Sequence, residues 1–376
     1  MCANVRTKVA QQQTAAGQPS GVVDDPDQEA PRGLRPERSR MQPALRRAFE
    51  ALEESGISWA VLRGDSELGS NGQDVDILAA PSDLSRLENA LAPLGYARLR
   101  SRGRGTHSFF VAYDGADGSW VKLDVVTDLA FGRYQELRLQ GAAGCLERRR
   151  QIGQLVVLAP GDAFWTLLLH CLLDAGTFTE AHRRSLLDLA DKAQCATSPL
   201  VPALERAVGG GWVHTLLAFA TAGDWSALGR TAPSLRAAWI RQRPLAVRRT
   251  FLGNAALRRA GRFPPLCRHG LVLSAQPADW ELAGQVAASW FLSHRLVRLG
   301  RSPLAQLGGA AVARGHATRG RLVILELGES TPPSRWLGWM SGAFDFTSVA
   351  GLTPGQHSLR TATAQIWRRF SERAGA

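Results

Sequence analysis

Two short apolar segments joined by a polar loop limit most strongly what this chain can fold into. The first spans residues 57–63 (ISWAVLR) and the second spans residues 73–80 (QDVDILAA). Both have the length and the branched apolar content of β-strands. A helical apolar repeat that ends at Gly56 precedes them, and another such repeat follows at residues 82–95. This order of helix, strand, strand and helix predicts a sheet covered by helices.

The following segments extend the predicted sheet. A short strand is expected at residues 96–100, and two longer strands are expected at residues 107–113 (HSFFVAY) and 119–127 (SWVKLDVVT), with the turn-forming sequence DGADG between them. The clear strands end before residue 135, and we assign residues 41–159 to this domain. The expected fold class is α/β in the broad sense (α+β), with a mixed sheet and flanking helices.

The chain on either side of this domain has a different composition. Residues 1–40 are polar, have no apolar repeat and are expected to be disordered. Residues 160–262 carry apolar stripes with helical spacing and predict a helical domain.

Residues 263–376 predict a small α/β-like region. A strand is expected at residues 269–275, a helix at residues 281–300 and a second strand at residues 320–327. The first strand, loop and helix have the outline of a kinase-like P-loop, but the lysine that would reach the phosphates is missing. We therefore interpret this region as a degenerate P-loop-like domain with a structural or docking role.

The net charge of +12 comes from arginine, because the sequence has only three lysines. The excess is concentrated in residues 226–278, which contain no Asp or Glu. Such a segment favours a polyanion, a phosphorylated substrate or an anionic membrane surface, and a solvated helical face explains it equally well. Its arginines are Arg230, Arg236, Arg241, Arg243, Arg248, Arg249, Arg258, Arg259, Arg262 and Arg268.

The cysteines and the hydropathy pattern bear on location. Five cysteines are scattered without a Cys-x-x-Cys pair, which favours a reducing compartment over a disulfide framework or a cysteine zinc site. No segment approaches the roughly 18 uninterrupted apolar residues of a membrane span, and the first residues have no apolar core typical of a signal peptide. We expect a cytoplasmic protein without a transmembrane segment.

Asp74 and Asp76 are separated by one residue on the second predicted strand. Because side chains alternate along a strand, both carboxylates point to one face while Val75 and Ile77 enter the core. Two carboxylates this close repel each other unless a cation lies between them. The pair therefore predicts a site for a hard divalent cation with oxygen ligands, most simply Mg²⁺.

A third carboxylate, Asp124, lies in a predicted strand, where aspartate is disfavoured without a special role. Lys122 shares its face and could hold a phosphate or offset the acidic charge. Gly64 ends the first strand and would let a triphosphate approach the backbone, with Ser66 supplying a hydroxyl. These features predict phosphate-binding groups beside a metal site. For Asp124 alone, a carboxylate bonded to the backbone at a strand end is the alternative.

The segments LRG, QDVDIL and VKLDVV together resemble the active-site pattern of the DNA polymerase beta-like nucleotidyltransferase superfamily. More narrowly, the chain is similar to the bacterial uncharacterised nucleotidyltransferase-like family. In that family the α/β domain is followed by helices containing LLLH and LLDLA, which here read LLLHCLLDAG and SLLDLADKA. The resemblance covers residues 42–195, about two-fifths of the chain.

The resemblance implies transfer of a nucleoside monophosphate from a nucleoside triphosphate, such as ATP, to an unidentified acceptor hydroxyl or phosphate. Asp74, Asp76 and Asp124 would be the catalytic residues and would bind two Mg²⁺ ions, and Asp124 would also assist deprotonation of the acceptor. The implied nucleotide-binding residues are Arg63, Gly64, Ser66 and Lys122.

Two alternatives stay open at this point. Asp65 stands where the superfamily usually has a small neutral residue, and its charge permits a catalytically inactive protein that binds nucleotide or a partner through the same fold. The arginine-rich segment permits a nucleic-acid binder or an RNA-directed nucleotidyltransferase.

Two histidines lie near the predicted site in the sequence. His107 precedes the strand of residues 107–113 and could reach the site, although a structural role is favoured for a lone histidine. His170 and Asp188 favour packing or a hydrogen bond between two helices, with closure of the substrate pocket as the alternative. Most of the tryptophans are spread over the helices and the C-terminal region, and they are interpreted as core residues and not as a stacking platform for bases.

Overall fold

The computed structural model describes most of the chain after the N-terminal segment. Gly64, Asp65 and Ser66 lie outside the described residues, and so does the segment 1–40 for which we expected disorder. The described ranges are residues 41–63, 74–99, 103–194, 198–260, 271–275, 279–290, 294–298, 303–317, 322–326, 343–345 and 359–374.

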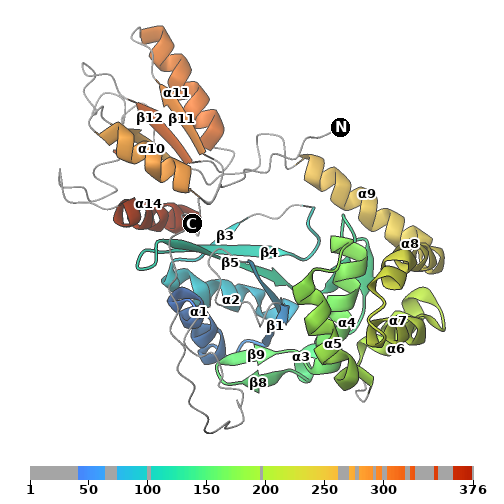
Figure 1. The fold of residues 1–376 in the computed structure, drawn as a ribbon. Helices are drawn as coiled ribbons and strands as arrows, with labels where there is room; N and C mark the ends of the chain where they lie inside the picture. The colour runs from blue at the N-terminus through green and yellow to red at the C-terminus, as the bar shows by residue number, and fades with distance from the viewer. Residues whose placement is uncertain are drawn as a thin grey trace, which may run out of the picture. The chain divides into compact units, whose positions relative to one another are not determined.

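A seven-stranded mixed sheet forms the centre of the fold (Figure 1). In spatial order its strands are β3 (Ala97–Leu99), β4 (Ser108–Asp114), β5 (Ser119–Val126), β2 (Asp74–Ala79), β1 (Trp59–Arg63), β9 (Leu155–Val157) and β8 (Arg150–Ile152). Strand β2 is antiparallel to β1 and parallel to β5, and β1 is parallel to β9. The remaining neighbours, β3–β4, β4–β5 and β8–β9, are antiparallel. The predicted fold class, a mixed sheet with flanking helices, is confirmed.

Helices α1 (Pro43–Glu54) and α2 (Leu84–Leu91) pack on one face of this sheet. Leu45, Phe49 and Leu52 have the spacing of one helix face and are all buried. Short 3₁₀ turns, Pro81–Asp83 and Ala92–Leu94, flank α2. The helices therefore cover one face of the sheet, and the polar side chains of β5 described next lie on the opposite face.

Strand β5 shows how the two faces are divided. Val121 and Leu123 are buried in the main hydrophobic core together with α1 and α2. Trp120, Lys122 and Asp124 alternate with them and therefore face the other side. The sheet thus keeps its apolar residues on one face of β5 and presents polar groups on the other.

Several short elements were not expected from the sequence. Strands β6 (Leu129–Phe131) and β7 (Leu137–Leu139) form a separate hairpin, and helix α3 (Ala142–Glu147) follows it. Strands β8 and β9 extend the central sheet beyond β1. Each of these strands has only three residues, which is too short for a periodic apolar signal.

The helical region begins directly after β9. Helix α4 (Pro160–His170) continues into a π-helical turn (Cys171–Ala175), and α5 (Glu180–Gln194) lies beside α4 (Figure 1). The other helices are α6 (Leu200–Val208), α7 (Trp212–Thr221), α8 (Trp225–Gln242) and α9 (Pro244–Ala260). A single cluster of buried side chains joins these helices to the sheet. Among the residues that the structure describes, no helix has the length and apolar character needed to cross a membrane.

Tryptophans contribute to the core as expected. Trp59, Trp165 and Trp239 are fully buried and are among the largest such side chains. Trp59 stacks on Phe49 with ring centroids 4.9 Å apart. The interpretation of these tryptophans as core residues is confirmed.

The C-terminal region contains a parallel sheet in the order β11 (His294–Arg298), β12 (Leu322–Glu326), β10 (Leu271–Ala275) and β13 (Ala343–Asp345). The described helices of this region are α10 (Trp280–Ser289), α11 (Pro303–Ala317) and α14 (Leu359–Ala374). The expected continuous helix over residues 281–300 is wrong. It ends at Ser289, and residues His294–Arg298 pair in register with β12 as strand β11.

Candidate functional site

The three predicted carboxylates lie together on the polar face of the sheet. In the parallel pairing of β2 with β5, Asp76 is opposite Asp124 and Asp74 is opposite Lys122. Residues opposite each other in a ladder share a face, so these four side chains point the same way. All three carboxylates line one pocket of about 370 Å³, which we call the carboxylate pocket. Strand alternation predicted that Asp74 shares a face with Asp76 and that Lys122 shares a face with Asp124, whereas the pairing of β2 with β5 brings the two pairs together.

Arg63 is aimed at Asp76 by a β-bulge. The register of β1 against β2 pairs Val61 with Ile77 and then shifts, so that Arg63 falls opposite Asp76. An uninterrupted ladder would place Arg63 opposite Val75 and turn its side chain to the other face. Its Nε and Nη2 lie 2.9 and 2.7 Å from Asp76 Oδ2.

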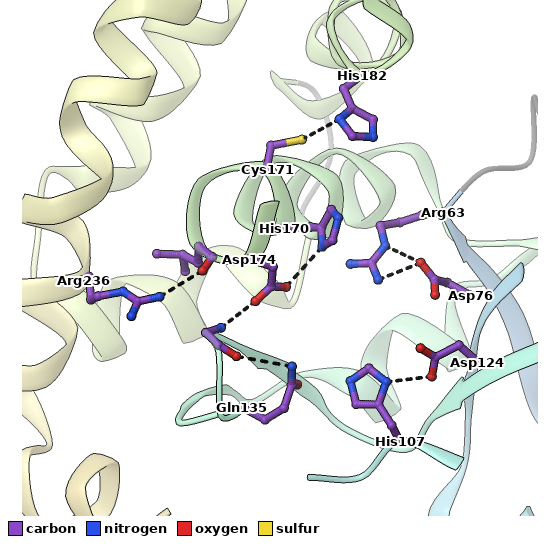
Figure 2. A network of polar contacts seen from close by, with 12 residues as sticks. Arg63, Asp76, His107, Asp124, Gln135, His170, Cys171, Asp174, His182 and Arg236 are labelled. Carbon is purple, nitrogen blue, oxygen red and sulfur yellow. Dashed lines mark hydrogen bonds and ion pairs between the residues drawn. The ribbon is translucent and has the colours of Figure 1, made fainter. Parts of the chain in front are cut away.

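The other two carboxylates also have basic partners. His107 Nδ1 lies 2.7 Å from Asp124 Oδ1, and both side chains are about 15% exposed (16% and 15%). Lys122 Nζ contacts Asp74 Oδ2. Figure 2 shows the Arg63–Asp76 and His107–Asp124 pairs. His107, for which the sequence favoured a structural role, therefore lies inside the site.

These contacts bear on whether the site fits a divalent cation. Within the described ranges, no three His, Cys, Asp or Glu side chains form a group that could hold a metal ion, and each carboxylate is paired with a basic side chain instead. Each of these pairs uses one carboxylate oxygen, namely Asp74 Oδ2, Asp76 Oδ2 and Asp124 Oδ1. The second oxygen of each carboxylate has no part in these pairs, the three residues line one pocket, and an all-oxygen donor set fits Mg²⁺.

A second pocket, of about 340 Å³, meets the first at the carboxylates. Arg63, Asp74, Asp76 and His170 line both pockets. The second pocket is walled mainly by apolar residues of β1, β9 and α4, and α5 adds polar side chains. We call it the side pocket. The two pockets differ in chemistry, since the carboxylate pocket is lined largely by charged groups.

His170 is held at the junction of the two pockets. Its Nδ1 lies 3.1 Å from Asp174 Oδ2, and Asp174 Oδ1 accepts a 2.6 Å hydrogen bond from the Gly132 backbone N–H. Figure 2 shows His170 beside Arg63. A carboxylate at Nδ1 orients the imidazole, which leaves Nε2 to face a ligand.

The prediction for His170 is confirmed for its packing but not for the carboxylate near it. Its ring packs edge-on against His182 of α5, with centroids 6.3 Å apart, so the expected packing between the two helices is confirmed. The carboxylate that its Nδ1 contacts belongs to Asp174, whereas Asp188 lies exposed on α5. The i,i+4 spacing of His170 and Asp174 was the signal that could have identified this pair.

Cys171 lies in the π-helical turn that also contains Asp174, but its thiol is not suited to act as a nucleophile. It is fully buried, and its Sγ lies 3.4 Å from His182 Nδ1. Burial raises the pKa of the Cys171 thiol to about 12, and nearby Arg63 offsets this only in part. The thiol is therefore neutral at physiological pH.

The arginine-rich segment divides between several environments. Arg258 lines the carboxylate pocket, whereas Arg248, Arg249 and Arg259 are exposed on α9. Arg236 contacts Glu136 Oε1 at 3.4 Å and donates to the Leu173 carbonyl at 2.9 Å. Sequence patterning could not identify which of these arginines would reach the site, because the spacing along α9 does not show where the helix meets the sheet domain.

Comparison with known proteins adds no family assignment. No family model, curated protein or solved structure matches the chain. The functional argument therefore depends on the geometry of the site.

Proposed function

We propose that this protein is a metal-dependent nucleotidyltransferase that moves a nucleoside monophosphate from a nucleoside triphosphate to an acceptor hydroxyl or phosphate. The observation that carries the proposal is the position of Asp76 and Asp124, side by side on parallel strands, with Asp74 on the same face and in the same pocket. Three carboxylates with a pocket of basic groups around them match the needs of phosphoryl chemistry, which requires both metal ligands and anion-binding groups.

Each residue of the site has a role in this proposal. Asp74, Asp76 and Asp124 would hold Mg²⁺, which when bound supplies charge stabilisation to the reacting phosphate. Asp124, oriented by His107, would accept the proton of an acceptor hydroxyl as its oxygen bonds to the α-phosphorus. The bond from that phosphorus to the bridging oxygen breaks, and pyrophosphate leaves.

Arg63 and Lys122 would exchange partners when substrate binds. Each now contacts a carboxylate that the proposal assigns to metal binding. A phosphate is an equally good partner for either cation. Its negative charge would replace that of the carboxylate, and the carboxylate would then bind the metal. The two pockets, which meet at Arg63 and the carboxylates of Asp74 and Asp76, give room for two substrates. For the location we propose the cytoplasm, which is consistent with the free, buried Cys145 and Cys171.

A transfer assay tests the proposal. Nucleoside triphosphates labelled at the α-phosphate are incubated with Mg²⁺ and cell extract, and label transfer and pyrophosphate release are measured. The wild type is expected to label an acceptor. Asp76→Asn and Asp124→Asn are expected to lose at least about a hundredfold in rate, since a lost metal ligand removes several kcal/mol of stabilisation. Asp188→Asn, at an exposed carboxylate on α5, is the matched control and should retain full activity.

A non-catalytic nucleotide-binding protein is the second candidate function. The observation that favours it is that each of the three carboxylates is already paired with a basic side chain of the protein, two of which, Arg63 and Lys122, are cations. Such a protein would bind nucleotide equally well in EDTA and in Mg²⁺, and it would release no pyrophosphate with any acceptor. Metal-dependent turnover that is lost in Asp76→Asn would eliminate this candidate.

A further inference from the structure

Three arginines from separate parts of the chain line the same end of the carboxylate pocket. Arg104 lies in the turn before β4, Arg133 lies in the hairpin between β6 and β7, and Arg258 lies near the end of α9. None of the three forms an ion pair with a carboxylate of the described residues. We call them the arginine cluster. They bring three positive charges into one pocket, which Asp128 and Asp174 also line.

Aromatic rings and backbone carbonyls hold the cluster in place. The guanidinium groups of Arg258 and Arg133 lie 5.0 and 5.5 Å from the centre of the Tyr134 ring, and that of Arg104 lies 5.7 Å from the Phe109 ring. Arg258 Nε donates to the Gly103 carbonyl at 2.8 Å. Cation–π contacts orient a guanidinium without neutralising it, so its remaining N–H groups can bind an anion.

The backbone is built to bring these like charges together. Gly103 has φ +71°, and a Cβ there would lie 2.5 Å from the Asn254 carbonyl oxygen and 2.6 Å from the Arg258 backbone nitrogen. Gly105 has φ +62°, and a Cβ there would lie 2.9 Å from Gln135 Cβ. Only glycine permits such a close approach in this backbone conformation. The turn that carries Arg104 therefore packs directly against the two segments that carry the other arginines.

Glu136, the carboxylate that acts electrostatically on Arg258, has other partners. Glu136 is buried, and its Oε2 accepts a 2.9 Å hydrogen bond from the Tyr134 backbone N–H while its Oε1 contacts Arg236 at 3.4 Å. Burial, together with repulsion from Arg104 and Arg133, lowers the pKa of Arg258. Holding like charges together is unfavourable because they repel each other. A bound anion relieves this repulsion and lowers the free energy of the cluster.

We infer that the arginine cluster is a binding site for a phosphate-bearing group of a substrate. Planar guanidinium groups that three separate segments bring to one pocket suit the oxygens of a phosphate better than they suit a single carboxylate. The inference deepens the proposed function and rests on it for the reaction at the other end of the pocket. The phosphate can belong to the triphosphate of the donor or to the acceptor, and the chemistry of recognition is the same in both.

Binding of inorganic tripolyphosphate without divalent cations tests this site. The affinity is measured by calorimetry for the wild type, Arg104→Gln, Arg133→Gln and the double variant. Arg104 and Arg133 are exposed, so the substitutions should not disturb folding. Each is expected to weaken binding about tenfold, which corresponds to one charge-assisted interaction. Arg249→Gln, an exposed arginine of α9 outside the pocket, should bind within about twofold of wild type. Tripolyphosphate that does not bind, or that binds the double variant as tightly as the wild type, would overturn the inference.

Competition with ATP identifies the source of the phosphate. If the cluster holds the donor triphosphate, tripolyphosphate displaces ATP and Arg133→Gln weakens ATP binding. If it holds a phosphate of the acceptor, ATP and tripolyphosphate bind together and ATP affinity is unchanged. Either result supports the site. The inference and the proposed function also fail separately: arginine-dependent binding without any nucleotide transfer would remove only the function, and transfer that needs Asp76 but not the arginines would remove only the inference.

Discussion

At the residue scale, Asp76 shows which features of the site the local sequence predicts and which it does not. Strand alternation is a local property, and it correctly placed Asp74 and Asp76 on one face. The partner of Asp76 depends instead on a bulge in β1, which turns Arg63 toward the carboxylate. A bulge shifts the register by one residue, and no pattern in this sequence marks its position. This ion pair could therefore not be predicted.

Arg63→Gln tests the ion pair directly. The two side chains are 15% and 24% exposed, so the pair is partly shielded from water. In EDTA, the substitution is expected to lower the free energy of unfolding by about 1–2 kcal/mol, measured by urea denaturation. A double-mutant cycle with Asp76→Asn should show coupling of about 1 kcal/mol, because the two substitutions remove the same contact. Strictly additive effects would show that the pair contributes nothing to stability.

The buried thiol of Cys171 gives a pH-dependent prediction. An unfolded thiol loses its proton near its ordinary pKa of 9.0, whereas burial keeps the folded thiol protonated up to about pH 12. The unfolded state therefore binds fewer protons in this window, and stability falls as pH rises from about 9 toward 12. Cys171→Ala should show a shallower decrease over the same range in urea titrations. An identical pH profile for both proteins would contradict the assigned environment.

At the scale of elements, length decided what could be predicted. Helices α1 and α2 and strands β4 and β5 carry enough residues to show their apolar period, and the structure contains each of them. Strands of three residues carry no such signal, and the helix expected to continue past Ser289 gave way to the strand pairing of β11 with β12. Tertiary pairing overrode a local apolar pattern that suited either structure.

The approach of α9 to the turn before β4 is tested with two glycine substitutions. Gly103→Ala is expected to destabilise the protein by about 1–3 kcal/mol, because a Cβ would meet backbone atoms of α9 at a positive φ. Hydrogen exchange of α9 should also become faster. Gly253→Ala, which lies within α9 with nothing within 4 Å, is the matched control and should stabilise the helix by about 0.5–1 kcal/mol. Equal effects at both positions would show that α9 does not contact this turn closely.

At the scale of the whole molecule, the polar face of the sheet serves two purposes. Asp124 lines the candidate site, and on the same strand Trp120 contacts the C-terminal region. The Trp120 Nε1 donates to the Ser289 carbonyl at 2.8 Å, and its ring meets Trp290 and Trp367 edge-on. Such contacts join residues far apart in the sequence. This is also why Arg104 and Arg258 could not be assigned to the site in advance.

Trp120→Ala tests the contact with the C-terminal region. Loss of the ring contacts and of the hydrogen bond is expected to reduce protection against hydrogen exchange in α10 and α14, measured by mass spectrometry. Trp225→Ala is the control, since Trp225 packs on Phe178 in the helical region and should leave α10 and α14 unaffected. Unchanged exchange in both variants would mean that Trp120 does not stabilise this contact.

The metal site is the centre of the proposed function, and Mn²⁺ binding in the presence of ATP measures it most directly. Electron paramagnetic resonance titration of the wild type should show Mn²⁺ bound to the protein beyond the amount that ATP alone holds. Asp76→Asn and Asp124→Asn should each weaken this binding at least about tenfold, whereas Asp188→Asn should match the wild type. Protein-bound Mn²⁺ that is undetectable in the wild type, or equally strong in all four proteins, would contradict the assignment of these carboxylates as metal ligands.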